Sequence, residues 1–266
     1  MTISLLAVAS AIITALLYIF TNVSWWFLLP IFLGLMVGIL LLVLTPCLLY
    51  VSQIDMEKPV EKSSKFINFY SALMLDVALT FMRIKLVYTG EEKLPNEPFL
   101  FVGNHRSNYD PLVGIFALRK HRVGFVAKKE LFKIPIIGRM MHLIFCLSLN
   151  RGTIRDEVKT IGRAIEVIDS GEASIGIYPE GTRNSGEGLL PFKNGAFKIA
   201  KKADCSVAVG VIRGSEECRK NFPKKTVVML DIVGVLDREY VSAHSTAEIS
   251  DKARDMMEEF ITTHKA

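Results

Sequence analysis

His105 and Asp110 are separated by four residues and follow the apolar run Phe99–Val102. If this run is a strand, the pair lies where the strand ends and a helix begins. The chain can turn back over this spacing, so the carboxylate can accept a hydrogen bond from one ring nitrogen and leave the other nitrogen basic. We predict that His105 is a general base and that Asp110 orients it.

The sequence contains no motif that would supply an enzyme nucleophile for such a base to activate. No GxSxG sequence occurs, so the turn that presents a serine nucleophile in α/β-hydrolases is absent from the sequence. We therefore expect the hydroxyl to belong to the substrate. The histidine–aspartate pair would deprotonate a substrate alcohol, and the alcohol would attack an acyl donor directly.

Cationic side chains follow several predicted strands. Arg183 ends the segment Pro179-Glu180-Gly181-Thr182-Arg183, which comes directly after Ser174–Tyr178. Its planar guanidinium suits a phosphate group. The turns beyond other predicted strands or before a helix carry further cations: Lys128, Arg151 and Lys193. This distribution predicts an anionic substrate beside the base.

Two of these segments resemble known motifs. Asn104-His105 with Asp110, followed later in the chain by Pro179–Arg183, resembles the HX4D and PEGTR blocks of the glycerolipid acyltransferases. The resemblance covers roughly Phe99 to Ile212, and it is closest to the bacterial 1-acyl-sn-glycerol-3-phosphate acyltransferases. Either block alone is a weak signal, whereas both in this order are a strong one.

The resemblance implies a reaction and a role for each residue. His105 would deprotonate the sn-2 hydroxyl of lysophosphatidate, with Asp110 orienting the ring. The alkoxide would attack a fatty acyl thioester and give phosphatidate without an acyl-enzyme. The thioester would be acyl-CoA or an acyl carrier protein conjugate, and neither a cofactor nor a metal is implied. The resemblance assigns the acceptor site to Lys128, Arg151, Glu180, Gly181, Thr182, Arg183 and Lys193. Another lysophospholipid or lipid acceptor is the alternative, and a non-enzymatic membrane module with the same fold is a more remote one.

The segments that must position these residues alternate between short apolar runs and helical patterns. This alternation predicts an α/β domain with a mostly parallel central sheet flanked by helices. The predicted strands are Leu86–Thr89, Phe99–Val102, Val123–Val126, Phe145–Leu149, Ser174–Tyr178, Val207–Ile212 and Val227–Val235. The predicted helices are Pro111–Lys120, Ile136–His142, Ile154–Asp169, Gly195–Lys202 and Thr246–Thr263.

The N-terminal segment differs from the rest in its charge. No Asp, Glu, Lys, Arg or His precedes Asp55. The apolar stretches Thr2–Phe20 and Phe27–Val51 are each long enough to cross a bilayer, which takes roughly 20 helical residues. We predict a membrane-embedded helical hairpin over residues 1–54, either spanning or re-entrant in one leaflet.

The segment after the hairpin carries the first positive charges, Lys58, Lys62 and Lys65. The positive-inside rule then predicts an inner or plasma membrane protein whose catalytic domain faces the cytoplasm. Residues 55–86 read as a linker with an amphipathic helix over Phe66–Leu86, which either packs on the body or lies on the bilayer. We interpret residues 87–266 as the acyltransferase domain.

Composition excludes several classes of protein. Half of the residues are hydrophobic and 22% are charged, which excludes a disordered chain. The four cysteines form no CxxC pair and show no metal-ligand spacing. The net charge is +5, but the basic residues are spread along the chain, so we expect membrane lipids and anionic substrates as partners and no nucleic acid.

Overall fold

The computed structural model describes residues 2–21, 24–149, 154–184, 186 and 188–264. Seven strands form one sheet in the order β1-β7-β6-β2-β5-β3-β4. The strands are β1 (Ile84–Thr89), β2 (Leu100–Gly103), β3 (Val123–Lys128), β4 (Leu147–Leu149), β5 (Ser174–Ile177), β6 (Val207–Arg213) and β7 (Thr226–Leu236).

The sheet is mostly parallel, as predicted. Strands β2 to β6 all run in one direction, and β7 pairs with β6 in the antiparallel sense. Strand β1 pairs with β7 in parallel, so these two strands run opposite to the others. Nearly every residue of β2 and β6 is buried, because helices cover both faces of the sheet. The carboxyl ends of the five parallel strands therefore meet at one edge.

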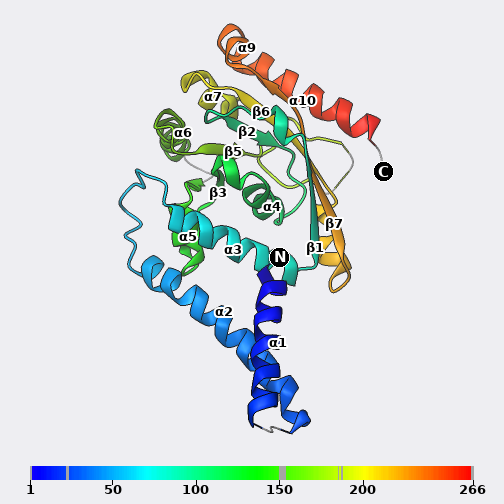
Figure 1. Cartoon of the computed structure of the whole chain (residues 1–266). Helices are drawn as coiled ribbons and strands as arrows, with labels where there is room; N and C mark the ends of the chain where they lie inside the picture. Colours follow the sequence, from blue (N-terminus) through cyan, green and yellow to red (C-terminus); the bar gives the residue numbers. More distant parts are fainter. Residues whose placement is uncertain (1, 22–23, 150–153, 185, 187, 265–266) are drawn as a thin grey trace.

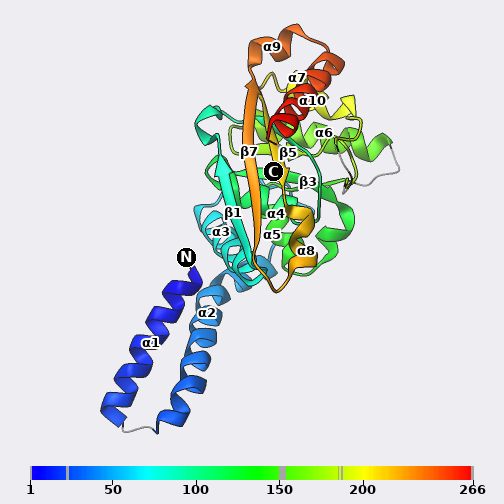
Figure 2. The same ribbon diagram turned by 90° about the vertical axis from the view of Figure 1, so that its right-hand side faces the viewer.

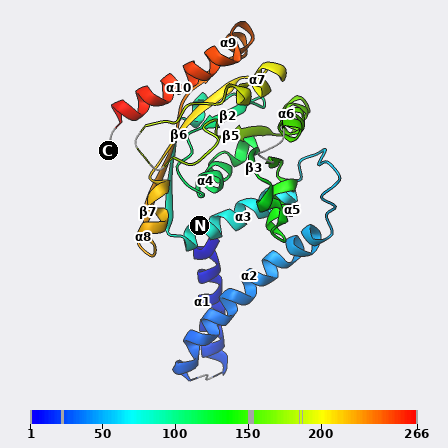
Figure 3. The same cartoon turned by 180° about the vertical axis from the view of Figure 1, so that it is seen from behind.

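The helices form two layers around the sheet (Figure 1). Residues of α6, α7 and α10 share one buried core with the sheet, and residues of α3 and α4 share the core on the other face. The helices of the body are α3 (Lys65–Phe81), α4 (Asp110–Ala117), α5 (Ile137–Leu143), α6 (Ile154–Asp169), α7 (Lys198–Lys202), α8 (Cys218–Asn221), α9 (Arg238–Ala243) and α10 (Thr246–Thr263). Helix α10 lies at the opposite end of the molecule from the N-terminal hairpin (Figure 3).

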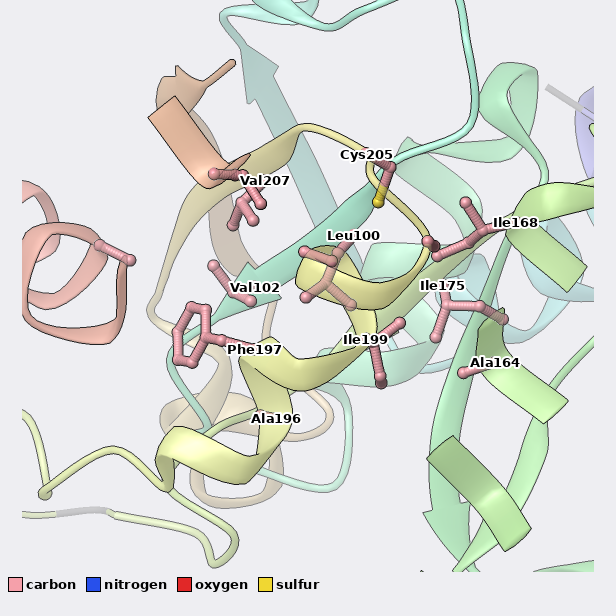
Figure 4. Close-up of a cluster of buried hydrophobic side chains, with 14 of the residues drawn as sticks. Leu100, Val102, Ala164, Ile168, Ile175, Ala196, Phe197, Ile199, Cys205 and Val207 are labelled. Atoms are coloured by element: carbon pink, nitrogen blue, oxygen red, sulfur yellow. The ribbon is translucent and has the colours of Figure 1, made fainter. Parts of the chain in front are cut away.

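The core beneath α6 and α7 shows how the strands become fixed in place. Leu100 of β2 and Ile175 of β5 point toward Ile199 of α7 and Ile168 of α6 (Figure 4). All four side chains are buried. Truncating such a side chain to alanine typically costs about 2–5 kcal/mol, so this layer holds the ends of β2 and β5 in register.

The N-terminal hairpin consists of α1 (Thr2–Thr21) and α2 (Leu28–Ser52), joined through a short 3₁₀ turn at Trp25–Phe27. The two helices lie side by side and extend away from the body (Figures 1 and 2). Both are long and apolar enough to cross a membrane. Large apolar side chains along them are exposed, with 80% of Phe20 and 74% of Leu42 accessible. An apolar surface of this extent is typical of a region that contacts lipid.

Helix α3 is shorter than the predicted helix Phe66–Leu86. It begins after Ser64, whose side chain accepts a hydrogen bond from Ile67 N, and it ends at Phe81 because Arg83 turns the chain with a φ of 59°. The inward-facing Ile67 and Tyr70 pack with Met140 of α5 and with residues of α2. The helix therefore packs on the body, while Phe81 at its C-terminal end stays exposed.

The structure also differs from the prediction in one strand start and in one additional helix. The strand expected over Phe145–Leu149 begins only at Leu147, since Phe145 adopts a φ of 61° and cannot continue the strand. The short helix Arg238–Ala243, capped by the Asp237 side chain, was not predicted.

Candidate active site

A cavity of about 630 Å³ opens at the carboxyl ends of β3 and β5, next to the loop that follows β2. We call it the catalytic cavity. Its lining includes six of the residues that the sequence singled out: His105, Lys128, Gly181, Thr182, Arg183 and Lys193. Asp110 and Glu180 lie behind this lining, in contact with His105. Arg151 lies outside the described residues.

Asp110 forms the centre of a dense set of hydrogen bonds. Its Oδ2 lies 2.8 Å from His105 Nδ1 and accepts the backbone N–H groups of Arg106 at 2.6 Å and Ser107 at 2.7 Å. Its Oδ1 accepts the hydroxyl groups of Ser107 and Ser215. The side chain has no exposed surface. Because so many donors converge on it, the carboxylate is held as an acceptor, and His105 Nδ1 must be the donor.

His105 is fixed through its backbone as well as its ring. Its N–H donates to Glu180 Oε1 at 2.8 Å, and its carbonyl accepts Asn184 N–H at 2.7 Å. The other oxygen of Glu180 accepts Leu190 N–H at 3.1 Å. Burial raises the pKa of the Glu180 carboxyl, although the two backbone hydrogen bonds act in the opposite direction. Glu180 therefore ties the Pro179–Arg183 segment to the histidine loop.

The histidine ring rests on an aromatic face. The rings of His105 and Tyr178 stack with centroids 4.5 Å apart and an interplanar angle of 11°. Tyr178 in turn stacks on Phe125 of β3. Stacking fixes the plane of the imidazole, while the side chain keeps 16% of its surface exposed. His105 Nε2 forms no hydrogen bond with any residue in the described ranges, so it is available to a ligand in the cavity.

Local sequence explains why the loop takes this shape. Asn104 extends the pairing of β2 with β6, since its amide group donates to Ile212 O at 2.9 Å and accepts from Ile212 N at 2.7 Å. Asp110 begins α4 with Pro111 in the first turn, a position where proline is well tolerated. A strand end and a helix start therefore fix the two ends of the loop that carries His105.

The cations line the cavity from a second loop and a strand end. Gly181 has a φ of 71°, and a Cβ atom there would lie 2.8 Å from Lys193 Cε. Glycine at this position thus lets the Lys193 side chain cross the turn. The side chains of Lys128, Arg183 and Lys193 make no ion pair or hydrogen bond with any residue that the structure describes. They are exposed and available to an anion.

The structure adds residues that the sequence interpretation missed. Ser215, which is fully buried, donates to Asp110, and Tyr178 supports the imidazole. A signal for Ser215 was present, because it follows β6 across the turn at Gly214, at the same edge of the sheet as His105.

The structure also bears on metal binding and on the reactivity of the cysteine thiols. Within the described ranges, no group of three or more His, Cys, Asp and Glu side chains is placed to hold a metal ion. Burial raises the pKa of the Cys146 and Cys205 thiols to about 12. These two cysteines are therefore poor nucleophiles at neutral pH.

Comparisons with known proteins find acyltransferases that are similar to this chain. A family model described as "Acyltransferase" matches residues 85–212. The chain is 34% identical to a 1-acyl-sn-glycerol-3-phosphate acyltransferase of Borreliella burgdorferi, over 50% of this chain and 53% of that protein. It is 30% identical to the protein of the same name from Haemophilus influenzae, over 61% of this chain and 68% of that protein.

A solved structure shares the fold over almost the whole length. It is the crystal structure of the 1-acyl-sn-glycerophosphate (LPA) acyltransferase PlsC from Thermotoga maritima, with a TM-score of 0.65 and 24% identity. The match covers 98% of this chain and 95% of that one. The sequence match covers two thirds of the Haemophilus protein, and the likeness to the solved structure extends to the fold. The chain belongs to the acyltransferase family.

Proposed function

We propose that this protein transfers a fatty acyl group from an acyl thioester to the sn-2 hydroxyl of 1-acyl-sn-glycerol 3-phosphate, and so makes phosphatidate. The observation that carries this proposal is the His105–Asp110 pair in a cavity that also exposes Lys128, Arg183 and Lys193. A base beside a cationic pocket suits an acceptor that has both a hydroxyl and a phosphate group. The relatives named above carry this activity in their names.

The reaction follows from the orientation of the imidazole. His105 Nε2 takes the proton of the sn-2 hydroxyl while the oxygen attacks the thioester carbonyl carbon. A C–O bond forms, and the C–S bond breaks when the tetrahedral intermediate collapses. The leaving thiolate receives the proton that Nε2 holds. Asp110 stabilises the imidazolium during this sequence, because its carboxylate stays hydrogen-bonded to Nδ1.

The remaining residues divide between binding and shaping the site. Arg183, Lys128 and Lys193 bind the acceptor phosphate in this proposal, and the Thr182 side chain lines the same cavity. Arg151 keeps its phosphate role on the sequence argument alone. Glu180 acts on the shape of the site, because both of its oxygens accept backbone N–H groups. Gly181 supplies the turn beneath Lys193.

The surroundings of the site suit a membrane substrate. In this proposal, residues 1–54 lie in an inner or plasma membrane, residues 55–86 link them to the body, and residues 87–266 catalyse the reaction on the cytoplasmic side. Lysine side chains directly after the hairpin support this orientation. The acceptor and the product both reside in the bilayer, so an anchored enzyme meets them without extracting them into water. The acyl donor is acyl-CoA or an acyl carrier protein conjugate.

The proposal is tested with the purified full-length protein in phospholipid vesicles. Lysophosphatidate and a labelled acyl thioester are supplied, and labelled phosphatidate is measured. His105→Ala should reduce the rate by about 10²–10⁴-fold, the usual contribution of a general base. His244→Ala is the matched control, because His244 stacks on Tyr240 outside the cavity.

Two results would change the conclusion. Full activity in His105→Ala would remove this residue from its role as the base. A wild-type protein that acylates other lysophospholipids but leaves lysophosphatidate unchanged would establish the alternative acceptor class.

A further inference from the structure

A second cavity of about 440 Å³ lies beside the catalytic cavity. We call it the linker cavity, because one wall is the segment between the hairpin and α3. That segment passes beside α5 and α6 (Figure 1). Its lining includes Met56 and Val60 of that segment, Phe132 and Lys133 of the Lys129–Lys133 segment, and Thr160 and Arg163 of α6.

The wall formed by the linker is held by specific hydrogen bonds. Arg163 donates to Val60 O at 2.6 Å, and the His142 ring lies 2.9 Å from Lys58 O. Ser63 N–H donates to a Glu172 oxygen at 2.9 Å, which anchors the end of the segment. These contacts fix an extended segment against two helices, so the linker cavity is a built feature of the fold.

The linker cavity carries an excess of positive charge. Its basic residues are Lys129, Lys133, His142, Lys159 and Arg163, whereas its acidic residues are Glu57 and Asp156. Arg163 and His142 are used in holding the linker. The amino groups of the three lysines form no ion pair with any residue in the described part of the chain. Exposed lysines that converge on one cavity without acidic partners are suited to phosphate groups.

The lining of the linker cavity also has an apolar part, which we call its apolar floor. This floor consists of the side chains of Phe132, Phe145, Leu147 and Val167. A single phosphate would leave this floor uncovered, and a volume of about 440 Å³ falls in the range of small-molecule sites. The cavity therefore suits a ligand with a phosphate group joined to a less polar part.

The linker cavity and the catalytic cavity are separated by a thin wall. Thr160 lines both cavities. Along the 3₁₀ segment Lys129–Lys133, Leu131 lines the catalytic cavity while Lys133 lines the linker cavity. In β4, Leu149 lines the first and Leu147 the second. The two cavities therefore lie next to each other, on either side of Thr160, β4 and the Lys129–Lys133 segment.

We propose that the linker cavity binds the phosphate-bearing end of the acyl donor, on the far side of its pantetheine arm from the thioester. Lys129, Lys133 and Lys159 bind the phosphate oxygens, and the thioester reaches His105 across the shared wall. This inference rests on the proposed function. The shared chemistry is a phosphorylated pantetheine, which occurs both in coenzyme A and on an acyl carrier protein.

The test uses the full-length protein in vesicles and three donors: acyl-CoA, acyl carrier protein and a phosphate-free acyl-pantetheine. In Lys133→Gln/Lys159→Gln, the KM for at least one phosphorylated donor should rise by roughly tenfold or more, the loss expected for a charge-assisted hydrogen bond. The KM for acyl-pantetheine should not change. Lys252→Gln is the control, because Lys252 is an exposed lysine on α10.

A direct measurement accompanies the kinetics. Radiolabelled adenosine 3′,5′-bisphosphate, the nucleotide end of coenzyme A, is offered to each protein in equilibrium dialysis. If the cavity is a coenzyme A site, this nucleotide should bind the wild-type protein and compete with acyl-CoA. The double variant should bind the nucleotide at least tenfold more weakly. A rise in KM for acyl carrier protein alone, without nucleotide binding, identifies the carrier protein as the source of the phosphate.

Three outcomes would overturn the inference. One is a KM within twofold of wild type for both phosphorylated donors in the double variant. Another is an equal rise in KM for the phosphate-free donor. The third is a rise in the KM for lysophosphatidate alone, which would make the linker cavity a lipid headgroup site. A wild-type protein without any acyl transfer would refute the proposed function instead, and the dialysis would still test the cavity.

Discussion

At one side of the catalytic cavity, the Asp110 carboxylate accepts five hydrogen bonds and His105 is held through its ring, its N–H and its carbonyl. At the other side, the side chains of Lys128, Arg183 and Lys193 make none with the described residues. The first side is fixed before any substrate binds, whereas the second leaves its donors to the ligand.

This difference matches two physical requirements. Proton transfer depends on a base that lies within hydrogen-bonding distance of its target, and small displacements are costly. Phosphate binding tolerates more movement, because a flexible cation can follow an anion that is tethered to a lipid. Substitutions at the histidine side should therefore act on kcat, and substitutions at the cationic side on KM.

Among the substitutions that compare the two sides, Asp110→Asn should have the largest effect. An amide can still accept the backbone N–H groups of Arg106 and Ser107 through its oxygen, so the loop should keep its shape. The negative charge that stabilises the His105 imidazolium is lost, and we expect kcat to fall by about 10²–10³-fold. Steady-state kinetics would measure this, together with a circular dichroism spectrum to confirm folding. A rise in KM with kcat unchanged would contradict the division between the two sides.

A smaller effect is expected for Arg183→Gln. Removing one charge-assisted pair with the acceptor phosphate should raise the KM for lysophosphatidate roughly 10–100-fold. The effect should vanish with 1-acylglycerol, which has the hydroxyl but no phosphate. Arg219→Gln provides the control, since Arg219 is exposed on α8 outside the cavity. Equal losses with both acceptors would show that Arg183 acts on the shape of the loop.

The two sides also differ in how far the sequence predicted them. His105 and Asp110 are five positions apart, and their contact follows from a strand end and a helix start that the apolar pattern indicates. The cations come from separate loops, and their convergence follows from the rule that carboxyl ends of parallel strands meet at one edge. The predicted order of strands and helices was correct because buried strands and amphipathic helices have distinct periods.

Other features depend on contacts between segments that are distant in the sequence. Ser215 lies 105 positions from Asp110, and Glu180 holds backbone groups of His105 and Leu190. The resemblance placed Glu180 in the acceptor site, but its role in tying the two loops together required the structure. The left-handed turn at Phe145 shortened a predicted strand because tertiary packing outweighed local preference.

Ser215 allows a finer test of the rigid side. Ser215→Ala removes one of the hydrogen bonds to Asp110 Oδ1 and leaves the others in place, so we expect a loss in kcat of about three- to tenfold. The decisive comparison is a double-mutant cycle with Asp110→Asn. If Ser215 acts through the carboxylate, its effect should be smaller when Asp110→Asn is already present. Independent, additive losses would limit Ser215 to packing.

The smallest effect concerns Glu180, which joins the two sides of the cavity. Burial raises the pKa of the Glu180 carboxyl in the folded protein above its ordinary value of 4.5, which applies to the unfolded chain. The folded protein therefore keeps this proton to a higher pH than the unfolded chain does. Between these two values the folded state holds more protons, so the free energy of unfolding falls as the pH rises through this window and levels off above it. Glu180→Gln cannot titrate. As the pH rises from 4.5, the Tm of wild type should therefore fall relative to the Tm of Glu180→Gln. A difference that shifts in favour of wild type would mean that the hydrogen bonds from His105 and Leu190 outweigh burial, and that the loop contact stabilises the fold through charge.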